Sequence, residues 1–74
     1  MENIITFASV THAMKARELL RQHRIHANLI RTPAKLRRGS CGYSLVIPRR
    51  FAEAAELIRD NRLPYRHMFG DDAQ

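Results

Sequence analysis

The chain has 74 residues, 45% of them hydrophobic, and a formal net charge of +6. This length predicts one domain with one small core, and the composition excludes wholesale disorder. Apolar runs of only a few residues exclude a transmembrane helix, and Met1-Glu2-Asn3 lacks the basic start of a signal peptide. We therefore expect a cytoplasmic protein with no membrane partner, and the charge indicates an anionic partner.

Hydrophobic periodicity and turn residues predict six elements in chain order. The expected strands cover residues 3–7, 26–32, 43–47 and 65–69. The expected helices run from a cap at Ser9 or Thr11 to His23, and from residues 48–49 to Asn61. A basic loop over residues 34–42 joins the second and third strands. Residues 1–70 are expected to form a single domain, followed by a flexible acidic tail at 71–74.

Apolar residues at i, i+3, i+4 and i+7 make the second helix the clearest element of the chain. Its end is expected at Asn61, which tolerates a left-handed cap conformation, and Arg49 is expected to pair with Glu53 on its solvated face. The helical patterns place five residues in the core: Ala16, Leu20, Phe51, Ala54 and Ile58.

The order βαββαβ predicts an α+β ferredoxin-like fold, with a four-stranded antiparallel sheet and two helices on one face. Right-handed crossovers make the first two strands parallel, and the third strand returns between them. The loop after the second strand is then expected at the same end of the sheet as the start of the first helix. This places Cys41 near the free backbone N–H groups of residues 9–12, which favour an anion.

Cys41 is the only cysteine, so it cannot form an internal disulfide. It lies in a stretch from Leu19 to Ala52 that contains eight basic residues and no acid. Positive neighbours stabilise the thiolate, which is the nucleophilic form, and flanking glycines leave the sulfur accessible. His12, in the first turn of the first helix, is a candidate ion-pair partner of the thiolate. The full set of candidate site residues is Cys41 with His12, Arg31, Pro33, Lys35, Arg37, Arg38, Gly39, Ser40 and Gly42.

The run Ile30-Arg31-Thr32-Pro33, followed after six residues by Ser40-Cys41-Gly42-Tyr43, resembles the signature of a small bacterial family. This is the selenium/sulfur (Se/S) carrier protein-like family, formerly a domain of unknown function. The segment from Phe7 to Ala13 is similar to that family's opening of the first helix. Two positions depart from the pattern: Ala34 replaces an arginine, with Lys35 one place later, and Arg24-Ile25 replaces a Gly-Ile step that closes the first helix.

The resemblance implies that Cys41 carries sulfane sulfur or selenium as a persulfide or selenopersulfide. A cysteine desulfurase or a selenocysteine lyase-type enzyme would be the donor, and a second protein the acceptor. Ser40 and the N–H groups of Cys41 and Gly42 would hydrogen-bond the terminal atom. No cofactor is expected beyond the covalently held chalcogen. The residues do not distinguish sulfur from selenium.

The alternative interpretation is a small basic ferredoxin-like module that binds nucleic acid or protein and has an inert, buried Cys41. The sequence favours nucleic acid less, because only Phe7 and Tyr43 are placed for base stacking. The four histidines and Cys41 lack metal-ligand spacing, so no metal site is expected. No catalytic set of side chains is apparent, which indicates a stoichiometric carrier or binding module rather than an enzyme. A second copy of the chain is a candidate partner for the exposed sheet face.

Overall fold

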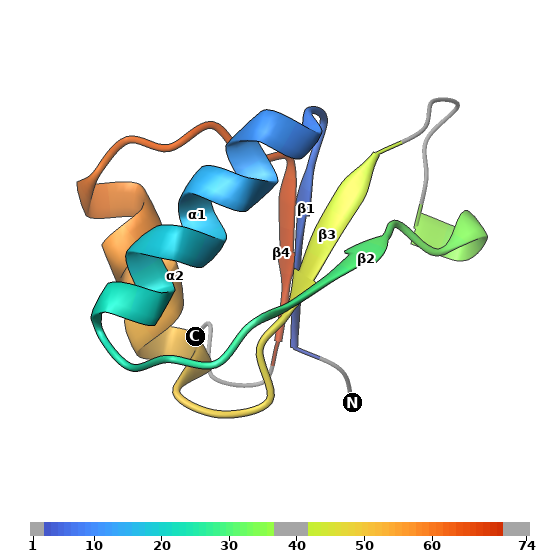
Figure 1. Cartoon of the computed structure of the whole chain (residues 1–74). Coiled ribbons are helices and arrows are strands. Elements are labelled where there is room, and N and C mark those ends of the chain that lie inside the picture. The colour runs from blue at the N-terminus through green and yellow to red at the C-terminus, as the bar shows by residue number, and fades with distance from the viewer. Residues whose placement is uncertain (1–2, 37–41, 71–74) are drawn as a thin grey trace.

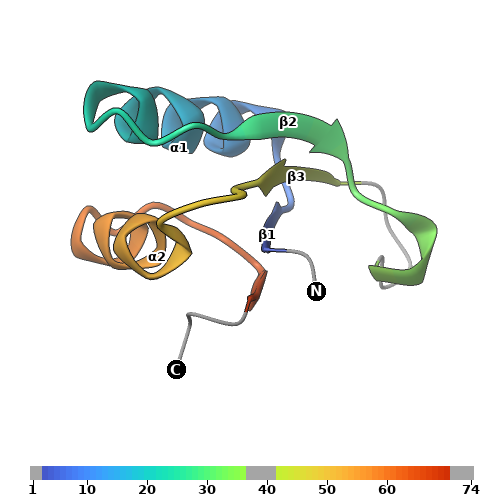
Figure 2. The ribbon, with the colours of Figure 1, turned by 90° about the horizontal axis from the view of Figure 1, so that it is seen from below.

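Four strands form one antiparallel sheet, and two helices cover one of its faces (Figures 1 and 2). The computed structural model describes residues 3–36 and 42–70. In chain order, the elements are β1 (Ile4–Phe7), α1 (Val10–Gln22), β2 (Asn28–Arg31), the 3₁₀ helix η1 (Ala34–Leu36), β3 (Tyr43–Val46), α2 (Phe51–Asp60) and β4 (His67–Phe69). This arrangement confirms the predicted α+β ferredoxin-like fold.

The strand order is β2-β3-β1-β4, with β1 and β3 at the centre. β3 therefore lies between β1 and β2, as the right-handed crossovers predict. Phe7 pairs with Tyr43, and Tyr43 pairs with Arg31, so β1 and β2 end at the edge where β3 begins. At the other end of β1, Ile4 pairs with both Val46 and Phe69.

The core lies between the helices and the sheet. Alternation along the central strands turns Ile5, Phe7 and Leu45 toward the helices, and all three are fully buried. The five residues predicted for the core are all buried: Ala16, Leu20, Phe51, Ala54 and Ile58. The helical periodicity of the sequence therefore identified the helix faces that pack on the sheet.

The outer strands are shorter than predicted. β2 begins at Asn28 rather than at residue 26, because its pairing with β3 begins opposite Val46. β4 begins at His67 rather than at residue 65, since its pairing with β1 begins opposite Thr6. The segment after β2 contains η1, whereas the sequence indicated a loop throughout.

The helix ends confirm one prediction and correct two. The Ser9 hydroxyl caps α1 by accepting a hydrogen bond from the Thr11 N–H at 3.1 Å. After α2, Asn61 has an ordinary φ of −91°, and the left-handed residue is Arg62, with φ 56°. Asn61 instead donates its side-chain N–H to the Leu57 carbonyl. Glu53 pairs with Arg50, where the sequence predicted Arg49.

In the part of the chain that the structure describes, no helix is long and apolar enough to cross a membrane.

Candidate functional site

One end of the sheet brings together the ends of β1 and β2 and the starts of β3 and α1. We call it the Gly42 end, defined by Phe7, Ser9, Thr32, Gly42 and Ser44. Figure 1 shows the start of α1 and the segments that flank the β2–β3 connection at this same end. The predicted proximity of this connection to the helix start is therefore confirmed for the described residues on both sides of it.

Gly42 is held tightly at this end. Its carbonyl accepts a hydrogen bond of 2.9 Å from the Thr32 N–H, which extends the pairing of β2 with β3 by one step. Gly42 also lies against the neighbouring strand: a Cβ at this position would be 2.7 Å from the Phe7 carbonyl oxygen. Because that contact is with the backbone of a central strand, no larger residue fits without a shift of the chain.

Two buried hydroxyl groups support this step. Thr32 Oγ1 and Ser44 Oγ are 2.7 Å apart and hydrogen-bonded, with the residues 6% and 0% exposed. Thr32 Oγ1 would also be 3.4 Å from a Cβ on Gly42, so the pair packs directly beside the glycine. Each hydroxyl satisfies the other in a buried position, where an unpaired one would cost about 1–3 kcal/mol. The sequence analysis did not predict this pair. Its sequence signal was a hydroxyl-bearing residue in or next to each of two adjacent strands, near the ends that face each other.

The start of β4 adds a basic residue that sequence reasoning also missed. The N–H of Arg66 donates to the Thr6 carbonyl at 2.7 Å, and the N–H of His67 donates to Thr6 Oγ1 at 3.1 Å. Both residues are exposed, and they lie beside the end of β1. Arg66 therefore adds positive charge at the Gly42 end from a segment far from Cys41 in the sequence.

The candidate site residues fall into two groups. His12 is half-buried in the first turn of α1, Arg31 is exposed at the end of β2, Pro33 is half-buried after it, and Lys35 is exposed in η1. Pro33, Lys35 and Gly42 thus belong to the β2–β3 connection, which Arg31 precedes, and His12 lies in the helix that starts at the same end of the sheet. The remaining candidates lie outside the described residues: Arg37, Arg38, Gly39, Ser40 and Cys41. The contact between His12 and Cys41 therefore stays a prediction.

The described residues contain no group of three or more histidine, cysteine, aspartate or glutamate side chains placed to hold a metal ion. The features at the Gly42 end are instead small residues, hydroxyls, a capped helix N-terminus and basic side chains. Such a setting suits an anion better than a cation, since exposed N–H groups and positive charges both favour negative charge.

The fold defines the class of the protein as a small ferredoxin-like α+β domain. Gly42, Thr32 and Ser44 line one end of its sheet. The chain matches, over residues 2–69, the family model described as "Putative Se/S carrier protein-like". It belongs to this family, and the resemblance noted in its sequence is confirmed. Comparisons with curated proteins and with solved structures gave no match.

Proposed function

We propose that this protein is a sulfur or selenium carrier that holds the chalcogen on Cys41 between a donor enzyme and an acceptor protein. The observation that carries the proposal is the family match over nearly the whole chain, residues 2–69. The geometry of the Gly42 end supports it, because the chain is anchored one residue after the cysteine. A reducing compartment such as the cytoplasm suits the chemistry, which needs a free thiol.

The loading step is an exchange between a thiolate and a persulfide. The Cys41 thiolate attacks the outer sulfur of a donor persulfide, and a new bond forms between the two sulfurs. The S–S bond of the donor breaks, and the donor cysteine leaves as a thiolate. One thiolate and one persulfide anion enter the step, and one of each leaves, so no oxidant is required. With selenium as the outer atom, the same exchange yields a selenopersulfide.

The described residues would position this step through Gly42. One peptide bond joins Cys41 to Gly42, and consecutive Cα atoms are about 3.8 Å apart. Gly42 itself is held by the Thr32 N–H and by its close approach to Phe7. The residue that follows Cys41 is therefore fixed beside the end of β1, at the end of the sheet where α1 starts. A fixed neighbour in the chain supports a defined transfer geometry.

Basic residues would stabilise the anionic forms of the carrier. Arg31, Lys35 and Arg66 are exposed at or near the Gly42 end. Arg37 and Arg38, outside the described residues, add two more charges close to Cys41 in the sequence. Positive neighbours favour both the attacking thiolate and the terminal anion of the persulfide. No second cysteine is present to discharge the persulfide as an internal disulfide.

The two aromatic residues that the sequence placed for base stacking, Phe7 and Tyr43, are not available for it. Phe7 is fully buried, and Tyr43 packs against the helix-side core. Neither aromatic ring is therefore presented on the open face of the sheet, where RNA-binding domains of similar topology stack bases. A carrier that meets its partners as proteins is favoured over a nucleic-acid module.

The test is loading by a purified donor. Incubation with a cysteine desulfurase and cysteine, or with a selenocysteine lyase and selenocysteine, should add the mass of one sulfur or one selenium. Thiol reductant should remove the added mass, because exchange cleaves a persulfide. Cys41→Ser should abolish the adduct while the circular dichroism spectrum stays unchanged. Absence of any adduct on the wild type, from either donor and from inorganic polysulfide, would show that the carrier proposal is wrong.

A further inference from the structure

One flank of α1 is exposed along its whole length and combines apolar with basic side chains. Val10, Met14, Arg17 and Arg21 follow the i, i+4, i+7, i+11 spacing of one helix face, and we call them the α1 flank. Val10 is 38% exposed and Met14 54% exposed, although both are apolar. The buried residues of α1 are Ala13, Ala16 and Leu20, which lie on a different side of the helix.

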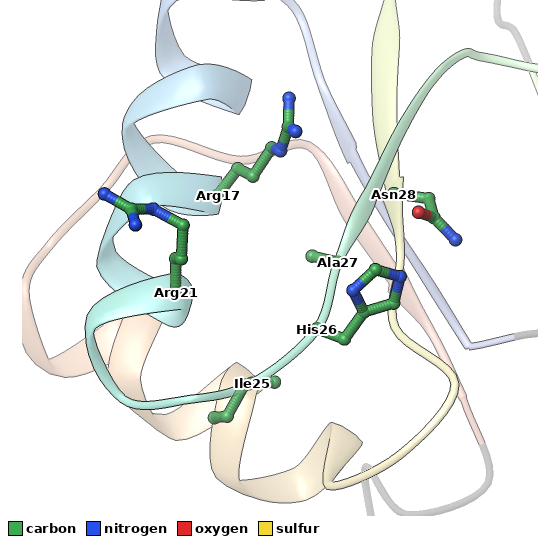
Figure 3. Close-up of a pocket in the computed structure, with 6 residues that line it drawn as sticks. All are labelled: Arg17, Arg21, Ile25, His26, Ala27 and Asn28. Carbon is green, nitrogen blue, oxygen red and sulfur yellow. The ribbon is translucent and has the colours of Figure 1, made fainter.

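Two adjoining hollows lie on the α1 flank and share Arg17 and Arg21. The first, of about 170 Å³, is lined by Met14, Arg17, Glu18 and Arg21. The second, of about 120 Å³, lies between α1 and the segment that enters β2 (Figure 3). Its further lining residues are Ile25, His26, Ala27 and Asn28. The α1 flank therefore has recesses next to positive charge, which suits the carboxylate groups of a partner.

The charges of the α1 flank are only partly neutralised within the chain. Arg21 donates from Nε and Nη2 to the two carboxylate oxygens of Glu18, at 2.9 and 2.7 Å. This hydrogen bonding lowers the pKa of Glu18, so the pair stays ionised at neutral pH. The Arg21 side chain is nevertheless 73% exposed, and three of its five N–H donors are not required by this bidentate contact. With Arg17 beside it, the surface carries net positive charge.

The α1 flank also begins at the candidate site. Val10 is the first residue of α1 and follows the Ser9 cap. It is three residues after Phe7, whose carbonyl lies against Gly42. From Val10 to Arg21 the helix rises about 17 Å. A partner lying along this surface would therefore reach the Gly42 end while its charged side chains contact the arginines.

We propose that the α1 flank is the docking surface for the donor enzyme, and that the donor presents acidic side chains to Arg17 and Arg21 and an apolar contact to Met14. The proposal rests on the proposed carrier function, for which it names a partner surface. Exposed methionine and valine between the charges favour a protein over nucleic acid, since a phosphate backbone offers them no apolar contact.

The test measures binding apart from sulfur transfer. The Cys41→Ser protein cannot be loaded, so its affinity for a purified cysteine desulfurase reports docking alone. The double variant Arg17→Glu/Arg21→Glu in this background should bind at least about ten-fold more weakly, because like charges would then face each other. The control Lys15→Glu/Arg59→Glu changes the net charge equally at exposed positions off the α1 flank, and it should bind as the parent does. Met14→Ser should weaken binding less than the double charge reversal.

A second measurement separates docking from chemistry. With Cys41 present, inorganic polysulfide should load the double variant and the wild type equally, while the desulfurase should need about ten-fold more of the double variant for the same rate. Equal affinity of the two charge-reversal variants, or no binding of the desulfurase at all, would overturn the docking proposal. So would binding of a single-stranded oligonucleotide through Arg17 and Arg21 without any effect on desulfurase binding. Failure of wild-type loading by polysulfide would overturn the carrier function instead, whatever the binding data show.

Discussion

The two ends of the sheet are held together by different kinds of side-chain contact. At the Gly42 end, beside the buried Phe7, Gly42 contacts Thr32, and Thr32 is hydrogen-bonded to Ser44. The opposite end, which we call the Arg50 end, is filled by the buried side chains of Ile25, Ile47 and Phe51.

The same contrast holds for polar contacts. At the Arg50 end, Arg50 is exposed and ties two helices together: Nη1 donates to the Arg24 carbonyl at 3.0 Å, and Nε and Nη2 donate to Glu53. At the Gly42 end, the polar contact between Thr32 and Ser44 is buried. A long, charged side chain makes the exposed polar contact at one end, whereas two short hydroxyl side chains make the buried polar contact at the other. The proposed chemistry is assigned to the end that has the buried hydroxyl pair.

The largest predicted effect comes from adding bulk at the Gly42 end. Gly42→Ala should lower the free energy of unfolding by about 2 kcal/mol or more, because its Cβ would overlap the Phe7 carbonyl and force a backbone shift. Urea denaturation measures the change. Ala8→Val, which adds bulk at an exposed neighbour of Phe7, serves as the control and should change stability far less. Equal stability of Gly42→Ala and wild type would refute the close approach.

The hydroxyl pair at the Gly42 end should show strong coupling. Ser44→Ala leaves the Thr32 hydroxyl buried without its partner and should cost about 1–2 kcal/mol. Thr32→Val, which keeps the shape, should cost a similar amount. The double variant should cost clearly less than the sum, because neither hydroxyl is then left unpaired. A double-mutant cycle from thermal unfolding gives the coupling energy, and simple additivity would argue against the pair.

A smaller effect, of opposite sign, is predicted at the Arg50 end. Arg24 has φ 61°, a left-handed conformation that costs a residue with a side chain about 1–2 kcal/mol. Arg24→Gly should therefore stabilise the protein by about 1 kcal/mol, net of the greater flexibility of glycine in the unfolded chain. Arg17→Gly, inside helix α1, which ends just before Arg24, should instead destabilise the protein by about 1 kcal/mol. Chemical denaturation of both variants would sharpen the comparison, and destabilisation by Arg24→Gly would contradict it.

The smallest predicted effect concerns pH at the Arg50 end. The hydrogen bond from Arg50 holds the pKa of Glu53 below its ordinary value of 4.5. A carboxyl whose pKa is lowered by folding adds stability above its unfolded pKa and loses that contribution as the pH falls through its folded pKa. The difference in melting temperature between wild type and Glu53→Gln should therefore shrink below about pH 4.5. In an Arg50→Met background, Glu53→Gln should show no such pH dependence. A difference that persists unchanged down to pH 2 would contradict the assignment.

The fold was predictable from the sequence because its signals are local and periodic. The apolar spacing in the second helix located Phe51, Ala54 and Ile58 in the core, and the order of elements with right-handed crossovers placed β3 between β1 and β2. Helix ends were less predictable. Intrinsic preference favoured Asn61 for the left-handed position, whereas Arg62 occupies it, and the next N–H, of Leu63, donates to the Ile58 carbonyl at 3.1 Å. Local propensity is a small energy, and the hydrogen bonds that end the helix outweigh it.

The candidate site was predictable only in part, because its supports join distant segments. Gly42 and His12 were identified from the motif around Cys41 and from the topology. The pairing of Thr32 with Ser44 and the position of Arg66 depend on strand register, which no local pattern reveals. Arg24-Ile25 is the reverse case, because the resemblance noted in the sequence expects a Gly-Ile step there. The backbone of Arg24 is left-handed, with φ 61°, a conformation that glycine adopts without strain.

The pairing of Ile4 with Phe69 has a consequence for engineering. Cα atoms of antiparallel partners are about 4.5–5.5 Å apart, so the two outer ends of β1 and β4 are neighbours at the Arg50 end. A short linker between them would close the chain into a ring, and new termini opened at the exposed Pro64–Tyr65 step would give a circular permutant. For the same reason, a fused enzyme or an affinity tag attached after Phe69 would begin at the end of the sheet opposite Gly42.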